Sequence, residues 1–300
     1  MPVTPSTGPI AAYRWLALWG LMLAAVGCRE GLDLAPEAVD DPILHFFLHF
    51  EDDESTELER ASWTYATFLE ECELTAQADG SNTRPECDLE QGLSTTMFTD
   101  AELTPLIDEG RLADYPTEEQ WDQAVSLVVA RRMPFSADVV EDVLALPNQA
   151  DVFPHFEWYV RNYLTSLDDY QAGTVEFLRT ENDVRTEYIL SAWGEYTLLL
   201  DFRSVHWDDG DSVRRVVLIR SWLYAAAVVG VEGGSVGFTF SIEVNIPCTD
   251  DQDQVWRTQG VWSHADIPGT LDDHDFWENQ LRDGTIDGFD QLQDWADGHN

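Results

Sequence analysis

The clearest pattern along the chain is a strict alternation of apolar with small or polar residues over residues 236–246. The apolar positions are Val236, Phe238, Phe240, Ile242, Val244 and Ile246. Successive side chains of a strand point to opposite faces, so this period of two predicts a strand with one buried face. Strands of this kind are typical of antiparallel sheets.

Similar strand-like segments dominate the chain after a predicted helix at Ser136, and one more precedes that helix. The other predicted strands cover residues 125–132, 174–179, 186–193, 195–205, 212–229 and 254–262. Turn-forming stretches such as Asp208–Asp211 and Glu232–Gly234 separate neighbouring strands, as they do in hairpins. This spacing predicts a meander of antiparallel strands.

Helices are predicted both before the meander and after it. Thr56 and Glu59 have the spacing of a capping box, and apolar residues then recur at intervals of three and four as far as Cys72. Shorter helices are predicted to begin at Asp100, Thr117 and Ser136. A last helix, over residues 273–297, is expected to pack on the sheet.

The last helix has an apolar stripe that includes two glycines. The stripe consists of Trp277, Leu281, Gly284, Gly288, Leu292 and Trp295. Because a glycine inside a helix costs about 1 kcal/mol relative to alanine, glycines on the stripe indicate close approach to another backbone or to a ligand. The elements together predict an α+β fold, in which an antiparallel meander has N-terminal helices and a C-terminal helix packed on it.

The first 27 residues have the order of a secretory signal. Arg14 is their only charged side chain, and an apolar run from Trp15 to Gly27 follows it. A run of about 13 residues is too short to cross a bilayer core of ~30 Å. The sequence Ala25-Val-Gly-Cys28 resembles the lipobox of bacterial lipoproteins, in which the cysteine is acylated and becomes the N-terminus. The resemblance implies a signal peptide over residues 1–27 and lipidation of Cys28.

Arg29 follows the cysteine, where lipoproteins kept at the inner membrane have aspartate. The resemblance therefore implies the outer membrane, with a lipid anchor as the contact to the membrane. Two or three acyl chains at ~0.8 kcal/mol per buried methylene hold a protein stably where one chain does not. Residues 28–41 would then form an acidic tether, 42–120 a region of helices and loops, and 121–300 the α+β domain. Cleavage as an ordinary secreted protein is the alternative.

The charge of the chain is strongly one-sided. The sequence has 57 acidic residues against 16 basic ones, a formal net charge of −41, and no lysine. The absence of lysine excludes a Schiff-base lysine and a P-loop lysine. A field of this sign repels nucleic acid and anionic head groups, so neither is expected as a partner. Solubility in a salty habitat would explain the excess, and so would binding of cations or of a basic partner.

Three cysteines remain after Cys28. Cys72 and Cys87 close a loop of about 15 residues through a turn-rich stretch. A disulfide between them is expected in an oxidising compartment and would contribute ~3 kcal/mol in the chain-entropy model. Cys248 is then left over and is expected to be a buried thiol at the end of a strand.

The order of elements over residues 121–297 resembles the helix-grip fold of START-related lipid-binding domains. The segment 134–144, followed by the aromatic-proline segment 153–158, carries the local likeness. In that family an apolar ligand lies between the closing helix and a concave sheet. The resemblance implies that the residues lining such a cavity are Phe238, Phe240, Ile242, Trp277 and Leu281. Residues 42–120 have no counterpart in the family.

One motif raises the question of catalysis. Gly233-Gly-Ser235-Val-Gly237 matches the G-x-S-x-G pattern of serine hydrolases, with His264 or His274 as a base. The nucleophile elbow of those enzymes needs a strand, a strained turn and then a helix. Here the motif leads directly into a predicted strand, so a glycine-rich turn is the competing interpretation.

Two further patterns bear on metal binding. His45 and His49 stand one helical turn apart and could share a metal, but the sequence offers no evident third ligand, and aromatic packing is the alternative. The acidic stretches 208–211, 250–253 and 272–275 lack the pattern of a calcium loop and are interpreted as solvated turns. No metal site and no cofactor are therefore predicted.

The leading hypothesis is an envelope-anchored lipoprotein that binds an apolar or amphipathic ligand without catalysis. The first alternative is an acidic interaction, structural or calcium-binding surface lipoprotein. The second is a serine hydrolase that uses Ser235.

Overall fold

The computed structural model describes most of the chain after residue 38. The described residues are 39–52, 56–79, 87–187, 193–208, 213–230, 234–248, 250–266 and 274–299. Residues Ala38–Asn300 form one compact unit. No helix among the described residues is both long and apolar enough to cross a membrane. Cys28 and the leader lie outside the described residues, so the signal peptide and the lipidation remain predictions.

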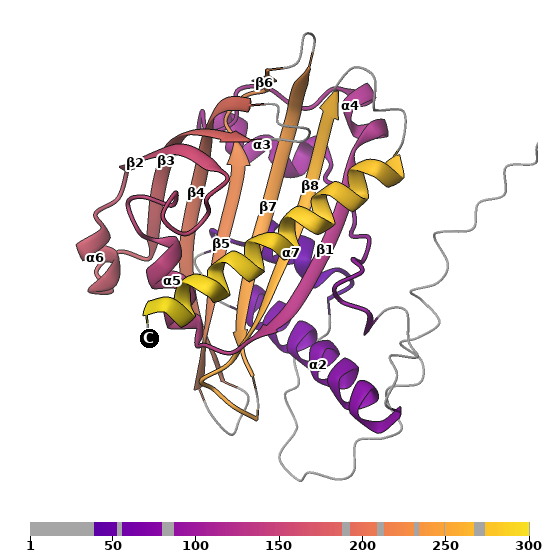
Figure 1. Ribbon diagram of the computed structural model, residues 1–300, viewed down its shortest axis with the longest axis vertical. Helices are drawn as coiled ribbons and strands as arrows, with labels where there is room; N and C mark the ends of the chain where they lie inside the picture. The colour runs from indigo at the N-terminus through magenta and orange to yellow at the C-terminus, as the bar shows by residue number, and fades with distance from the viewer. Residues whose placement is uncertain are drawn as a thin grey trace, which may run out of the picture. The chain divides into compact units, whose positions relative to one another are not determined.

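The fold is α+β, with seven helices and eight strands among the described residues (Figure 1). The helices are α1 (Pro42–Leu48), α2 (Thr56–Asp79), α3 (Asp100–Asp108), α4 (Glu118–Gln123), α5 (Ala137–Leu144), α6 (Leu167–Gln171) and α7 (His274–His299). The strands are β1 (Val125–Met133), β2 (Phe156–Tyr163), β3 (Phe177–Glu187), β4 (Trp193–Asp208), β5 (Val213–Leu223), β6 (Ala227–Val229), β7 (Ser235–Pro247) and β8 (Val255–Asp266).

All the strands belong to one antiparallel sheet of the order β1-β8-β7-β5-β4-β3-β2, and the short β6 pairs with both β4 and β7. Helices cover both of its faces. Figure 1 shows α7 and α5 in front of the sheet, with α2 and α3 behind it. We call the front the α7 face and the back the α1 face. The predicted meander with a packed C-terminal helix is confirmed.

The N-terminal helices share a core with the α1 face. This core contains Phe46, Phe47 and Phe50 around α1, Leu58 and Leu69 from α2, and Leu103 from α3. It also contains Phe240, Ile242 and Trp262 from the central strands. Burial of so many aromatic and aliphatic side chains, at roughly 1.5–3 kcal/mol each, fixes residues 42–120 to the sheet.

Capping explains why several helices begin where the sequence predicts. Thr117 accepts a hydrogen bond from the backbone N–H of Gln120, and the Gln120 side chain accepts one from the N–H of Thr117. α5, the helix that follows β1, begins at Ala137 with Ser136 as its N-cap. α3 begins at Asp100, but its capping box is formed by Thr99 with Glu102. Backbone donors satisfied by side chains account for the starts of α3 and α4, whereas Ser136 makes no side-chain capping hydrogen bond.

The strand predictions need three corrections. β2 was not predicted; it is an edge strand that buries only Tyr159 fully, so its sequence has no apolar alternation. β3 runs unbroken from Phe177 to Glu187, and its buried polar residues Thr180 and Asn182 hide the pattern of period two. The segment predicted as one strand over 212–229 is two strands, β5 and β6.

A β-bulge interrupts the alternation that the sequence analysis found unbroken in β7. The register with β8 shifts between Val236 and Phe238. Val236 therefore joins a small cluster with Leu223 and Trp277, whereas Phe238 lies in the core of the α1 face. An extra residue in one strand turns all the following side chains to the other face.

A buried group of ions also joins the N-terminal region to the sheet. The Asp201 side chain is 0% exposed and pairs with Arg111 and Arg220. Arg220 Nη2 donates to Asp201 Oδ2 at 3.0 Å. Glu51, just after α1, accepts from both of these arginines and from Arg179 Nη2, the last at 2.7 Å. Each of these charges thus has an opposite charge in contact with it.

The cysteines lie as predicted. Cys72, in α2, is bonded to Cys87, and this disulfide closes residues 73–86. Cys248 follows the end of β7 and is a buried free thiol. Burial raises the pKa of that thiol to about 12, so it is protonated at neutral pH and is a poor nucleophile.

Candidate functional site

The α7 face of the sheet carries two separate apolar clusters. One lies under α5 and the C-terminal half of α7 and includes Phe289, Leu292, Val217, Ile219 and Phe202. The other lies near the N-terminal end of α7, where Trp277 packs against Leu223, Ala227, Val229 and Val236. No single core therefore fills this face from end to end in the part of the chain that the structure describes.

A row of small hydroxyl side chains lies between the two clusters, on the central strands. Ser221 and Ser241 hydrogen-bond across β5 and β7 at 2.7 Å, and Thr239 and Ser263 do so across β7 and β8 at 2.8 Å. Ser221, Thr239 and Ser263 are half-buried. So is Leu200, their neighbour on β4. Central strands under a tightly sealing helix would be fully buried, so water reaches this part of the face.

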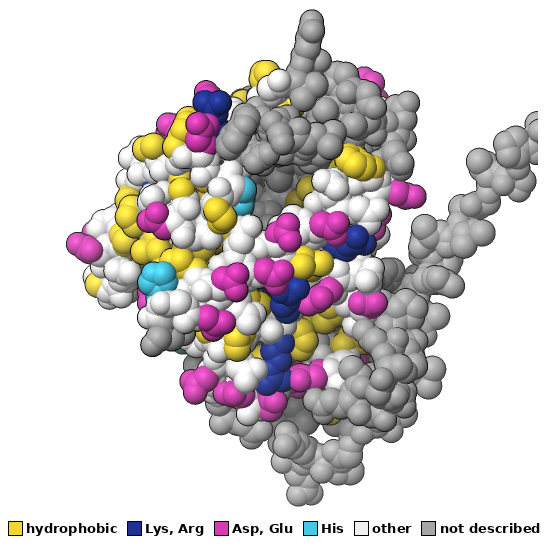
Figure 2. Space-filling view, viewed as in Figure 1, with side chains coloured by type: hydrophobic (Ala, Val, Ile, Leu, Met, Phe, Trp, Pro, Cys, Tyr) yellow, Lys and Arg dark blue, Asp and Glu magenta, His cyan; other side chains and the backbone are white. Residues whose placement is uncertain are grey.

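Figure 2 views the molecule from the α7 side and shows the surface hollowed beside the helix. Trp277 and Leu281, which are half-buried, project from α7 to this face and pack on the two clusters. The hydroxyl row and the two α7 side chains thus bound a region that is apolar at its ends and polar in the middle.

A buried ion pair lies deeper on the same face. Arg257 Nε and Nη2 contact Glu243 Oε2 at 2.9 and 2.7 Å. The Arg257 guanidinium also lies 4.9 Å from the centre of the Phe289 ring of α7. Asn245 is the cross-strand neighbour of Arg257. Arg257 thus lies with the cluster under the C-terminal half of α7 and not in the gap between the two clusters.

Several buried polar atoms on this face have no hydrogen-bond partner among the described residues. They include Arg257 Nη1, Asn245 Oδ1 and Trp277 Nε1. A buried polar group without a partner costs about 1–3 kcal/mol, so such groups mark places where water or a ligand supplies the missing bond. Trp277 lies at the N-terminal end of α7, whereas Arg257 and Asn245 lie near Phe289 in its C-terminal half, so these atoms mark two separate places.

The structure divides the predicted ligand-binding residues between the two faces. Trp277 and Leu281 project from α7 and pack against the clusters on the α7 face, and their part in ligand binding stays a prediction. Phe238, Phe240 and Ile242 lie on the α1 face instead, where Phe240 packs against Phe47 with ring centres 6.1 Å apart. The prediction that these three strand residues face α7 across a cavity is therefore wrong. Both faces of the sheet are covered, and the apolar set of β7 faces the larger core while its polar set faces α7.

The helix glycines do not allow another backbone to come close. A Cβ placed on Gly284 or Gly288 would meet no atom within 4 Å, so the prediction of close approach to another backbone is wrong. The residues of α7 that are buried are Thr285, Phe289, Leu292 and Ala296. In the C-terminal half of α7, the buried positions are therefore 285, 289, 292 and 296, where the prediction gave 284, 288, 292 and 295.

The hydrolase motif lies in a sheet. Ser235 is the first residue of β7 and pairs with Val228 and Asp266, and a strand rather than a helix follows it. His264 stacks on Phe238, and its Nε2 lies 3.3 Å from Gln123 Oε1. Burial lowers the pKa of His264. The strand–turn–helix elbow needed to expose a nucleophilic serine is not formed at Ser235.

The described residues contain two groups of three side chains whose donor atoms converge. One is His45, His49 and Glu57, and the other is His274, Asp275 and Glu278 at the start of α7. Burial and the neighbouring His49 lower the pKa of His45, which favours its neutral form. Sequence reasoning missed Glu57 as the third member of the first group, because a different helix carries it.

The acidic stretches behave as solvated turns where they are described. Asp250 pairs with Arg132, and Asp251 accepts hydrogen bonds from Asp253 and Gln254 of its own turn. Residues 209–211 and 272–273 lie outside the described residues.

Comparisons with known proteins give matches to solved structures alone. No protein-family model matches the chain, and no curated protein matches it. A crystal structure of the Zhui aromatase/cyclase from Streptomyces sp. R1128 is similar, with 14% identity, a TM-score of 0.38, and coverage of 58% of this chain and 94% of that one.

Two other similar structures carry the family name that the sequence resembles. A START superfamily protein from Mycobacterium smegmatis has 8% identity, a TM-score of 0.37, and coverage of 58% of this chain and 99% of that one. A STAR-related lipid transfer protein from Xanthomonas axonopodis has 14% identity, a TM-score of 0.36, and coverage of 60% and 95%.

Proposed function

We propose that the α7 face binds an apolar or amphipathic small molecule without converting it chemically. The observation that carries the proposal is the gap between the two apolar clusters, where central-strand side chains such as Ser221 and Leu200 stay half-buried beneath a helix. Ligand sites in proteins are mostly apolar, with a few well-placed polar groups that orient the ligand. The arrangement under α7 has that composition.

The polar middle of the face supports a ligand with a polar end. Trp277 Nε1 is a buried donor with no partner among the described residues. A ligand carboxylate, hydroxyl or carbonyl would accept from it, while the apolar part of the ligand would lie against Leu281 and Leu200. An uncharged hydrocarbon would leave this donor unpaired, so an amphipathic molecule fits better than a purely apolar one.

Displacement of a fluorescent fatty acid from the purified chain tests this proposal. Leu281→Arg places a charge beneath α7, and we expect it to weaken probe binding at least tenfold. Asn279→Arg is the matched control, because it adds the same charge at an exposed position of the same helix. Equal probe affinity in the wild type and both variants, or no saturable binding in the wild type, overturns the proposal.

We also propose that the chain is cut before Cys28 and held at the outer membrane by acyl chains on that residue. The lipobox-like residues before Cys28 support this, and the exposed acidic surface is compatible with a domain that stays in water. Metabolic labelling with radioactive palmitate tests it. We expect label in the wild type and none in Cys28→Ser, while an unlabelled wild-type chain would contradict the anchor.

A second candidate function is binding of calcium or a basic partner. The outward surface of α7 carries a run of exposed acidic residues, seen as magenta side chains in Figure 2. They are Asp283, Asp287, Asp290, Asp294 and Asp297. Thermal unfolding with and without millimolar calcium separates the two candidates, since a site under α7 gives no calcium-dependent rise in the unfolding temperature.

A further inference from the structure

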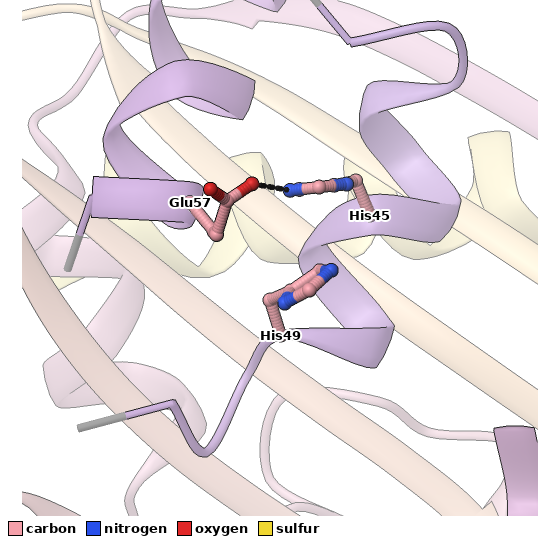
Figure 3. Close-up of side chains that lie close together, drawn as sticks. All are labelled: His45, His49 and Glu57. Atoms are coloured by element: carbon pink, nitrogen blue, oxygen red, sulfur yellow. Dashed lines mark hydrogen bonds and ion pairs between the residues drawn. The ribbon is translucent and has the colours of Figure 1, made fainter. Parts of the chain in front are cut away.

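Two histidines and a glutamate converge where α1 meets α2. His45 Nε2 lies 3.0 Å from Glu57 Oε2, and the imidazole rings of His45 and His49 have centres 4.0 Å apart. One donor atom of each residue lies within 4.8 Å of the donor atoms of the other two. Figure 3 shows the Glu57 carboxylate facing the His45 ring, with His49 one turn further along α1.

The packing of α1 explains why these side chains meet. Ile43, Leu44, Phe46 and Phe47 are buried. A Cβ on Gly260 of β8 would collide with Ile43, so this glycine lets α1 lie close against the sheet. With those positions buried, residues 45 and 49 share the remaining side of the helix. The first turn of α2, which carries Glu57, covers that side.

The donor set is one that zinc uses. Two imidazole nitrogens and one carboxylate oxygen are the protein ligands of many zinc sites in which a water takes the fourth position. With metal–ligand bonds of 2.0–2.1 Å, tetrahedral ligands lie about 3.4 Å apart. The donor atoms here lie within 4.8 Å of one another, so small side-chain movements would bring them to that spacing. Calcium and magnesium prefer oxygen ligands throughout and fit this set poorly.

Neighbouring residues hold two of the three donors in place. His49 Nδ1 lies 2.7 Å from Asp52 Oδ2, which leaves Nε2 as the atom that His49 offers to a metal. A carboxylate on the far nitrogen orients a metal-binding imidazole and makes it a better donor. Arg60 Nη1 donates to both oxygens of Glu57, at 2.9 and 2.8 Å, and fixes that carboxylate.

The cluster is accessible to an ion from water. The side chains of His45, His49 and Glu57 are 18%, 34% and 32% exposed. An ion entering here would have protein ligands on one side and water on the other, and it would connect α1 to α2.

We propose that His45, His49 and Glu57 bind one divalent transition-metal ion of the zinc class, with water completing its coordination. Asp52 is a positioning residue that acts through His49. This site is separate from the α7 face and does not depend on the ligand proposed there.

Titration of the purified full chain with Co²⁺ in the presence of millimolar calcium tests the site. Calcium occupies the many surface carboxylates, and Co²⁺ in tetrahedral coordination has a characteristic visible absorption. We expect one equivalent of Co²⁺ to bind, zinc to displace it, and His45→Ala or His49→Ala to weaken binding at least tenfold. His206→Ala is the matched control, because that exposed histidine lies on β4 away from the cluster.

A second variant keeps the test decisive if the alanine variants unfold. Asp52→Asn removes the carboxylate behind His49 from a half-exposed position, and we expect it to weaken binding 10–100-fold while circular dichroism is unchanged. Absence of saturable Co²⁺ binding in the wild type overturns the proposal. So does wild-type affinity in His49→Ala.

Discussion

Replacement of Asp201 by asparagine would test whether buried charges fix the N-terminal region to the sheet. The Asp201 side chain is 0% exposed, and it contacts Arg111 and Arg220, whose side chains are 12% and 6% exposed. Removing one member of a buried ion pair typically costs 3–5 kcal/mol, because the remaining charge is left buried without full compensation. Glu51 still neutralises part of the arginine charge, so we expect about 3 kcal/mol.

Equilibrium unfolding in urea measures this effect. We expect the free energy of unfolding of Asp201→Asn to fall by about 3 kcal/mol, a large part of the 5–15 kcal/mol typical of folded domains. Asp138→Asn is the control, because Asp138 pairs with Arg215 at the surface and its side chain is 69% exposed. Exposed pairs contribute about 0–1 kcal/mol.

A rescue variant separates charge from shape. Asp201→Asn combined with Arg111→Met removes both members of one pair, and replacing a whole buried pair is often neutral. We therefore expect the double variant to recover part of the lost stability. If Asp201→Asn changes the unfolding free energy no more than Asp138→Asn, the buried charges do not hold this region to the sheet.

Three further predictions follow from individual contacts. Gly284→Ala should raise the free energy of unfolding by about 1 kcal/mol, because its Cβ meets no atom; a decrease would show that something approaches α7 there. Gly260→Ala should lower it by about 1–3 kcal/mol, because the new methyl group collides with Ile43; an unchanged value would contradict the close packing of α1. Burial lowers the pKa of His264 below its ordinary value of 6.5, so the unfolded chain binds the proton first as pH falls below 6.5. The free energy of unfolding of the wild type, relative to that of His264→Leu, should therefore decline as pH falls. Parallel pH profiles of the two proteins in urea unfolding would contradict this.

Local signals in the sequence predict the elements well. The capping pair Thr117 and Gln120 and the N-cap Ser136 place helix starts correctly, because caps act through residues three positions apart or fewer. The strict alternation in β7 predicts a strand for the same reason. Short-range geometry decides these features, so a sequence window contains the information.

The assignment of faces is where sequence reasoning fails. Alternation separates the two sides of β7, but it does not say which side faces α7. We expected the apolar side of β7 to face α7, which holds when helices cover only one face of the sheet. Helices cover both faces of this sheet. Phe240 therefore lies against Phe47 of α1, and Ser241 lies beneath α7.

The metal cluster shows a second limit. His45 and His49 are one turn apart and visible as a pair, but Glu57 belongs to another helix whose position depends on tertiary packing. Acidic residues are so frequent in this chain that no single glutamate stands out as a third ligand. Long-range packing selects one of them.

Native mass spectrometry of the purified chain after incubation with a long-chain fatty acid tests the proposed function most directly. The account predicts one bound molecule per chain, lost in Leu281→Arg and retained in Asn279→Arg. A chain that carries no ligand at saturating fatty acid, with the same mass as the untreated protein, would contradict it.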